Sequence, residues 1–195
     1  MSVLLTDTDD ALSTLFEPSS VLRNKLVPEI NQFKSNSSLA DSRTTYTYID
    51  LIELAMSLIS QWDIQSKAQF IAAHPRIGEV KNLSAHSQKE QASIETPNDV
   101  LVRLGELNAF YEARYPGLRY ITFVNGRSRT QIKEELQARL AIDHSWPGER
   151  SIDDALCDVT PIQAGSAEWI VELERAITDV GLIAKHRARA IMGCI

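Results

Sequence analysis

Two short stretches of this chain carry side chains that can move a proton at neutral pH. They are His74-Pro75-Arg76-Ile77-Gly78-Glu79 and Ser87-Gln88-Lys89-Glu90-Gln91. A free imidazole has a pKa of about 6.5, so a histidine gives or takes a proton near pH 7 with little tuning. Proline disfavours the α conformation in the residue before it, which predicts His74 at a helix exit with its ring pointing outward. We therefore expect a proton donor and the Glu90 carboxylate a short loop apart.

The second stretch has a spacing that places polar side chains on one helix face. His86 and Glu90 are four residues apart, as are Ser87 and Gln91, and residues at this spacing are neighbours on a helix surface. The resulting polar stripe either lines a pocket or is a solvated face. With His74, the first pair also offers three ligands for a catalytic zinc ion, although no second motif supports a metal. For His74 itself, the alternative is a helix-terminal histidine that bonds a nearby carbonyl.

Arginines in two regions are candidates for holding an anionic group. Arg127 and Arg129 follow the most strand-like run of the chain, and guanidinium groups suit carboxylates and planar polar ligands. Alternatively, Ser128 caps the next helix and both arginines are solvated. Arg187 has apolar neighbours at helical spacings. An arginine on such a face needs an anionic partner, which singles it out among the C-terminal basic residues.

Length and composition limit the class of protein. A chain of 195 residues is most simply one domain, covering 1–195, with a core of its own. The net charge of −6 disfavours binding to nucleic acid or an anionic membrane, but a locally basic pocket can still bind an anionic small substrate. Two widely spaced cysteines predict reduced thiols. With no signal peptide, membrane span or Ser-Lys-Leu-type ending, the sequence predicts a cytoplasmic protein.

Helical periodicity dominates the chain. The predicted helices cover residues 9–16, 20–30, 49–62, 63–74, 84–95, 97–115, 128–140 and 167–191. Ser20 and Asp63 are predicted helix caps, Pro28 predicts a kink or a stop, and 31–42 is predicted to be a loop. Tyr120–Val124 is β-branched and aromatic but has no evident partner strand, so it is predicted to be an extended segment packed on helices. The predicted fold is all-α, a single helical bundle with this one extended segment.

These motifs, in this order, resemble those of the OHCU (2-oxo-4-hydroxy-4-carboxy-5-ureidoimidazoline) decarboxylase family of urate degradation, most closely its fungal-type members. The resemblance extends over nearly the whole chain, and the His-Pro and Ser-x-x-Glu-Gln pieces are its most specific parts. The matching stretches are Leu15–Ser19, Ala73–Gly78, Ser84–Ala92, Leu107–Gly117, Tyr120–Arg129 and Ile183–Arg187.

The resemblance implies an all-helical, typically homodimeric enzyme that uses no metal or cofactor. Its small anionic substrate, OHCU, would be converted to (S)-allantoin and CO2. By the same resemblance, His74 would donate the proton, Glu90 would be the catalytic carboxylate and Arg187 would hold the substrate carboxylate. The implied substrate-binding residues are Pro75, Ser87, Gln91 and the extended segment, Tyr120, Ile121, Thr122, Phe123 and Val124, whose backbone groups would bond the heterocycle.

Other functions fit the same residues. A helical ligand-binding or regulatory module could keep the pocket without turnover, although such a module has no need of a proton donor. A decarboxylase of a related ureido compound would use the same side chains. Metal-dependent hydrolysis is a third hypothesis, and it requires a bound metal.

Overall fold

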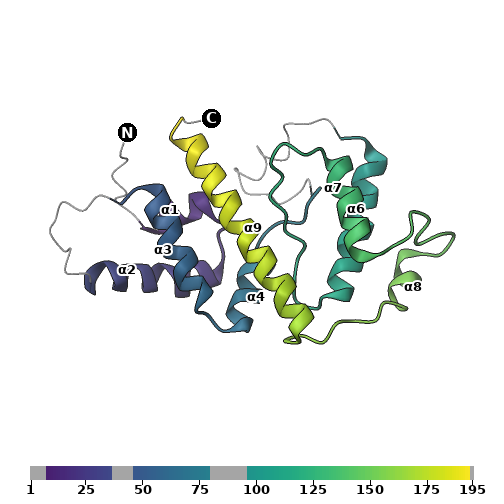
Figure 1. Ribbon diagram of the computed structural model, residues 1–195, viewed down its shortest axis with the longest axis horizontal. Coiled ribbons are helices and arrows are strands. Elements are labelled where there is room, and N and C mark those ends of the chain that lie inside the picture. The colour runs from purple at the N-terminus through teal and green to yellow at the C-terminus, as the bar shows by residue number, and fades with distance from the viewer. Residues whose placement is uncertain (1–7, 37–45, 80–95, 194–195) are drawn as a thin grey trace. The chain divides into compact units, whose positions relative to one another are not determined.

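The computed structural model describes residues 8–36, 46–79 and 96–193 (Figure 1). Its elements are α1 (Thr8–Leu15), the π-helical turn η1 (Leu22–Leu26), α2 (Val27–Asn36), α3 (Tyr48–Ser60), α4 (Ile64–Ala72), α6 (Asn98–Arg114), α7 (Arg129–Leu140), α8 (Ile152–Leu156) and α9 (Ala167–Ile191). These residues contain no strand, which confirms the all-α prediction. None of the described helices is long and apolar enough to span a membrane. The helix predicted over 84–95 lies outside the described residues.

The chain divides into two compact units. The N-terminal unit combines Met1–Ala73 with Ile177–Ile195, and the central unit is His74–Ala176. Helix α9 therefore begins in the central unit and ends in the N-terminal unit. The expectation of one domain over the whole chain stays a prediction.

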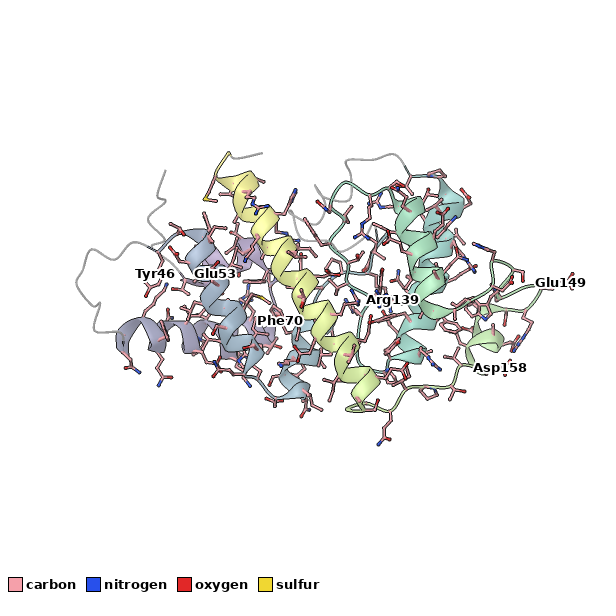
Figure 2. The ribbon with its side chains drawn as sticks, viewed as in Figure 1. Tyr46, Glu53, Phe70, Arg139, Glu149 and Asp158 are labelled. Carbon is pink, nitrogen blue, oxygen red and sulfur yellow. The ribbon has the colours of Figure 1, made fainter. Side chains whose placement is uncertain are left out.

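The N-terminal unit has a core in which aromatic rings meet edge to face. The Phe70 ring, labelled in Figure 2, lies 5.7 Å from the Phe16 ring and 6.0 Å from the Trp62 ring between centroids. Such pairs stabilise a core beyond the area that they bury. Around them α1, η1, α2 and α3 pack on one another. Fully buried aliphatic side chains complete this core: Leu12, Leu15, Leu22, Leu26, Ile30, Leu51, Ile52, Ile59 and Ile71.

Capping side chains set several helix starts. Asp63 accepts a hydrogen bond of 2.8 Å from the Ser66 backbone N–H and caps α4, as predicted. The second helical run is capped differently, because Ser19 Oγ accepts from the Leu22 N–H at 3.2 Å while Ser20 is already helical. The prediction of Ser20 as the cap is wrong by one residue.

Pro28 does not stop the helix. The chain forms a π-helical turn just before it, in which the Val27 N–H donates to the Leu22 carbonyl, five residues back. A wider turn of this kind accommodates a proline, which lacks the N–H of a normal α-helical bond. Helix α2 then continues to Asn36, so the loop predicted from residue 31 is wrong over 31–36. Residues 37–42 of that predicted loop lie outside the described residues.

The central unit is organised around α6. Helices α7 and α8 both pack on α6 (Figure 1). The buried face of α6 carries Leu104, Leu107 and Tyr111, none of which has measurable exposure. Helix α7 begins with a capping box, in which Ser128 Oγ accepts from the Gln131 N–H and the Gln131 side chain bonds back to the Ser128 N–H. This arrangement confirms Ser128 as a helix cap. Helix α6 also contacts the His74 loop and the Tyr120–Val124 segment, which are described next.

Candidate active site

His74 opens a loop that directly follows α4. Its backbone carbonyl accepts a hydrogen bond of 2.5 Å from Arg119 Nη1, and the Ile77 carbonyl accepts one of 3.0 Å from Asn108 Nδ2 on α6. His74 is only 5% exposed. The helix-exit position is confirmed, but the prediction of an outward-pointing ring is wrong, because His74 is buried. The two bonds hold the backbone of the loop against the rest of the central unit. Pro75, the next predicted site residue, is half-buried.

A second anchor of this loop is an ion pair with α6. Arg76 Nε and Nη2 donate to the two Glu112 carboxylate oxygens at 2.7 and 2.6 Å. The hydrogen bonds that Arg76 donates to Glu112 raise the pKa of Arg76 above its usual value. The Arg76 backbone N–H donates to the Glu79 carboxylate at 3.0 Å, which closes the loop on itself. Arg76 therefore fixes the loop to α6.

Gly78 is required where this loop turns. Its φ is +82°, and an added Cβ would lie 3.1 Å from Leu104 Cδ1. Gly117, with φ +85°, has no atom of the described residues within 4 Å of such a Cβ and serves as a matched control. We expect Gly117→Ala to lower the free energy of unfolding by about 1 kcal/mol, the cost of a left-handed conformation, and Gly78→Ala to lower it by about 2 kcal/mol. Urea unfolding of both variants would measure this, and equal losses would contradict a role for the Leu104 contact.

Tyr120–Val124 forms an irregular segment, with no residue in a helix or strand. Tyr120 and Ile121 are each 4% exposed, and exposure rises to 36% at Val124. The Tyr120 ring meets the Tyr111 ring of α6 at 5.4 Å. Burial raises the pKa of Tyr120, so its phenol stays protonated. The prediction that this segment packs on helices is confirmed.

Arg127 folds back onto the same segment. Its Nε donates to the Val124 carbonyl and its Nη2 to Thr122 Oγ1, both at 3.0 Å, and its Nη2 also bonds to the Phe123 carbonyl. Its Nη1 pairs with Glu135. The alternative of a merely solvated Arg127 is wrong, since this guanidinium holds the segment in place.

Arg129 lies beside residues that precede α6. Its Nη1 donates to Thr96 Oγ1 at 2.7 Å, and partial burial lowers its pKa. The solvated alternative is therefore also wrong for Arg129.

Arg187 has the anionic partner that its apolar surroundings required. Its Nη2 donates to Glu17 Oε1 at 2.9 Å and its Nη1 to the Leu15 carbonyl at 3.3 Å. Both charged side chains are only 6% exposed. The partner is thus a carboxylate of the N-terminal unit itself, and a substrate carboxylate that binds Arg187 has to share the guanidinium with Glu17.

The predicted site residues cannot all be brought into one site here, because some lie outside the described residues and the others belong to two different units. Glu90, Ser87 and Gln91 lie outside the described residues, as does His86 of the alternative zinc site. His74 and Tyr120–Val124 belong to the central unit, whereas Arg187 belongs to the N-terminal unit. Within the described residues, no group of three or more His, Cys, Asp or Glu side chains is arranged to hold a metal ion.

A buried cluster around Glu172 was missed by sequence reasoning. Glu172 and Arg175 on α9, together with Tyr111 on α6, form a connected set of hydrogen bonds in the central unit. The signal was present, because Glu172 and Arg175 are interleaved with the apolar residues Leu173, Ala176 and Ile177. Charged residues on an apolar helical face need partners, which is the same argument that singled out Arg187.

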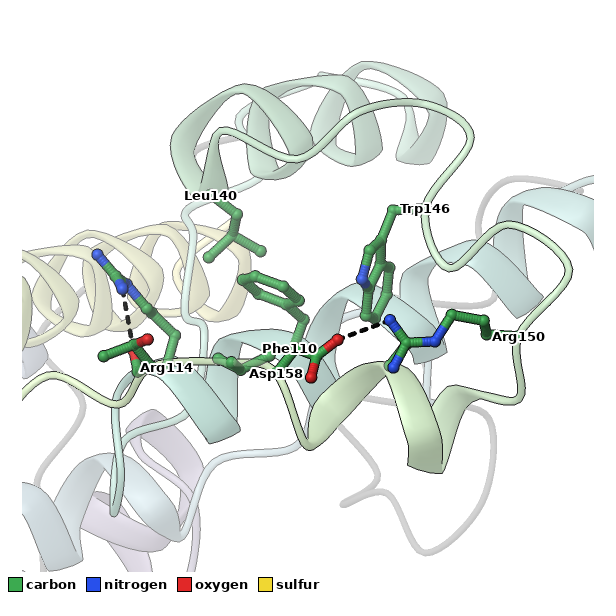
Figure 3. Close-up of a pocket in the computed structure, with 9 residues that line it drawn as sticks. Phe110, Arg114, Leu140, Trp146, Arg150 and Asp158 are labelled. Atoms are coloured by element: carbon green, nitrogen blue, oxygen red, sulfur yellow. Dashed lines mark hydrogen bonds and ion pairs between the residues drawn. The ribbon is translucent and has the colours of Figure 1, made fainter.

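The central unit also contains a cavity of about 410 Å³ away from the predicted residues (Figure 3). Arg150 in its wall pairs with Asp158 at 2.6 Å, and Arg114 donates to the Thr160 carbonyl at 2.9 Å. Both guanidinium groups are therefore engaged by the wall itself. Its lining residues are Phe110, Arg114, Leu140, Trp146, Arg150, Ala155, Asp158, Val159 and Thr160. None is a predicted site residue, so we do not assign the reaction to this cavity.

Comparison with known proteins bears on the family of this chain. The family model described as OHCU decarboxylase matches residues 5–160, which include His74 and Tyr120–Val124 but not Arg187. A solved structure, the crystal structure of OHCU decarboxylase in the presence of (S)-allantoin, is similar in fold with a TM-score of 0.52. That likeness covers 85% of this chain and 91% of the other at 21% identity. A search of curated proteins finds no match. Because the family model matches most of the 195 residues, the chain belongs to the OHCU decarboxylase family.

Proposed function

We propose that this chain decarboxylates 2-oxo-4-hydroxy-4-carboxy-5-ureidoimidazoline to (S)-allantoin and CO2 in the degradation of urate. As a member of the family, the chain is a carboxy-lyase. The observation that carries the proposal is the family match over residues 5–160, which contains the buried and doubly anchored His74 loop. A rigid donor in a nearly dry setting is what a single proton delivery requires.

The reaction makes modest demands on the protein. When the bond between the ring carbon and the carboxylate breaks, CO2 leaves and the electron pair delocalises into the adjacent imine and carbonyl system of the substrate. The protein has to hold the carboxylate out of the ring plane and deliver one proton to one face of the neighbouring ring carbon, which bears the ureido group. The carbon that lost CO2 keeps its oxygen and becomes a carbonyl as its hydroxyl proton passes to the ring nitrogen. Positioning of this kind contributes on the order of 7 kcal/mol or more to lowering a barrier.

We assign the steps to the predicted residues as follows. His74 delivers the proton, and a single donor explains why one enantiomer forms. Glu90 orients either the imidazole or the ureido group. Pro75, Ser87, Gln91 and the Tyr120–Val124 segment bind the heterocycle, and Arg187 binds the substrate carboxylate while it is shared with Glu17. These roles are supported by the burial of His74 and by the carboxylate chemistry of Arg187.

We further propose a homodimer in the cytoplasm. The resemblance to the family supports the dimer, and the exposed side chains of Val171 on α9 (70%) and Val102 on α6 (55%) are available for its contacts. Light scattering of the purified chain would test the dimer, which requires twice the mass of one chain. Fractionation of the cells that produce it would test the compartment.

A substrate panel tests the proposed function. CO2 release would be measured for the wild-type chain with OHCU, with allantoin and with other carboxylated ureido compounds. The proposal expects release from OHCU far above the uncatalysed rate and none from allantoin, which has no carboxylate to lose. Release from another ureido acid alone would favour a related substrate, and release from none would favour a ligand-binding module.

A further inference from the structure

The backbone carbonyls of the Tyr120–Val124 segment are held by two guanidinium groups. Arg175 Nη1 on α9 donates to the Ile121 carbonyl at 2.8 Å. Arg127 donates to the Phe123 and Val124 carbonyls from the other end of the segment. Arginine suits this task because its planar group presents several donors in a fixed geometry. Three of the acceptors of the segment are thus bonded by the protein itself.

The backbone donors of the segment are in a different state. Among the described residues, the N–H groups of Ile121, Thr122 and Val124 donate to no hydrogen-bond acceptor. Buried backbone groups normally have a partner. Of these three residues Ile121 is buried and Thr122 half-buried, whereas Val124 is exposed. A segment whose carbonyls are held and whose N–H groups are offered is suited to a ligand rich in acceptors, such as the carbonyl groups of a ureidoimidazoline.

Arg175 is itself held rigidly from behind. Its Nε lies 3.0 Å from both Glu172 carboxylate oxygens, and its Nη2 lies 2.7 Å from Glu172 Oε1. Glu172 is 4% exposed and accepts a further bond of 2.8 Å from the Tyr111 hydroxyl. The Arg175 guanidinium also lies 5.3 Å from the centroid of the Tyr120 ring, within the range of a cation–π contact. One side of this guanidinium is thus fixed by the carboxylate and the other faces the segment.

The Tyr111 phenol keeps its proton at neutral pH. Burial, followed by the negative charge of Glu172, raises the pKa of Tyr111 well above its usual value. The phenol therefore remains the hydrogen-bond donor to Glu172.

We infer that Arg175, held by Glu172, is a positioning residue that fixes the Ile121 carbonyl so that the segment presents its N–H groups to the substrate heterocycle. This inference rests on the proposed function for the identity of the ligand. Arg175 acts through the backbone of the segment and is not assigned to the chemistry. Its loss is expected to weaken substrate binding more than it slows the chemical step.

Arg139 provides a matched control. It lies on α7, is labelled in Figure 2 and reaches Glu172 Oε2 through its Nη1 at 3.2 Å. In the described part of the chain, it makes no hydrogen bond to Tyr120–Val124. Arg139→Gln therefore removes a positive charge from Glu172 without removing a contact to the segment, whereas Arg175→Gln removes both.

Steady-state kinetics on OHCU separate a positioning role from a structural one. We expect Arg175→Gln to raise KM about ten-fold or more with kcat within about three-fold of wild type, because the charged hydrogen bond that fixes the Ile121 carbonyl, and with it the substrate-binding segment, is lost. Arg175→Lys keeps one positive donor but not the bidentate contact to Glu172, so its KM should be intermediate. Arg139→Gln should keep the wild-type KM. A wild-type KM in Arg175→Gln, or in Arg175→Lys if the Gln variant does not fold, would overturn the inference.

A second readout does not depend on activity. Chymotrypsin cleaves after aromatic residues, and Tyr120 and Phe123 both lie in the segment. We expect cleavage at these two positions, followed by mass spectrometry, to be about ten-fold faster in folded Arg175→Gln than in Arg139→Gln. Equal rates would overturn the positioning role. If wild type fails to turn over OHCU, the proposed function fails, and the proteolysis result alone decides whether Arg175 holds the segment.

Discussion

Replacing His74 by alanine is expected to lower kcat for OHCU decarboxylation by about a thousand-fold, the usual contribution of a positioned proton donor. The buried position of His74 explains the size of the effect, because water has poor access to replace the imidazole. The KM should change little, since the backbone of the loop is held by Arg119 and Asn108 rather than by the ring. Initial rates on OHCU over a range of concentrations would measure both constants.

His144 offers a matched control for this variant. It is an exposed histidine in the loop after α7, where its Nδ1 lies 3.3 Å from Gln137 Nε2. His144→Ala removes the same side chain from the central unit and should leave kcat unchanged. If His74→Ala, with wild-type thermal unfolding, keeps more than about a third of kcat, His74 is not the donor.

Breaking the Arg187–Glu17 pair should be the most destabilising change among the charged residues. Both side chains are 6% exposed, so each single replacement removes an ion-pair partner from a charge in the interior. We expect Glu17→Gln and Arg187→Met each to lower the free energy of unfolding by about 3 kcal/mol, and the double variant to lose clearly less than the sum. Urea unfolding of the four proteins would give the coupling energy.

An exposed ion pair serves as the control for this cycle. Arg150 and Asp158 are as close, at 2.6 Å, but are 51% and 70% exposed. Neutralising either one should cost less than about 1 kcal/mol, because water screens the pair. Additive losses in the Arg187–Glu17 cycle would contradict a coupled buried pair.

The Glu17→Gln variant also tests whether Arg187 binds the substrate. With Glu17→Gln, the guanidinium is no longer shared with the Glu17 carboxylate, so a substrate carboxylate held there should bind more tightly. A KM several-fold below that of wild type is expected in the variant at a temperature where it is folded. An unchanged KM would limit Arg187 to a structural role.

Local signals predicted the fold well where capping residues and periodicity agreed. Asp63 caps α4 as predicted, and the predicted range of the last helix, 167–191, matches α9. The prediction failed at a non-standard helical turn and at a short helix. At Pro28 a π-helical turn preserves the helix, and the short helix α8 is capped by Ser151 inside a stretch without apolar periodicity. Periodicity rules assume regular α-helices of some length, so both features escape them.

The site was less predictable because its contacts join residues far apart in sequence. Glu17 and Arg187 are 170 positions apart, so the sequence around Arg187 predicted a need for an anion but not its source. Arg119 donates to the His74 carbonyl across 45 positions of sequence. The effect of Pro75 on the residue before it predicted the helix exit at His74, but it could not predict that His74 is buried there. Backbone rules fix local conformation, whereas burial depends on the tertiary contacts.

The handedness of the product shows whether this chain catalyses the decarboxylation of OHCU with His74 as the proton donor. OHCU would be generated in situ from urate, and circular dichroism would be followed after adding the wild-type chain. We expect rapid loss of the substrate signal and the appearance of (S)-allantoin with the wild-type chain, and neither change to be accelerated by His74→Ala. Decay at the background rate to racemic allantoin in the presence of the wild-type chain would contradict it.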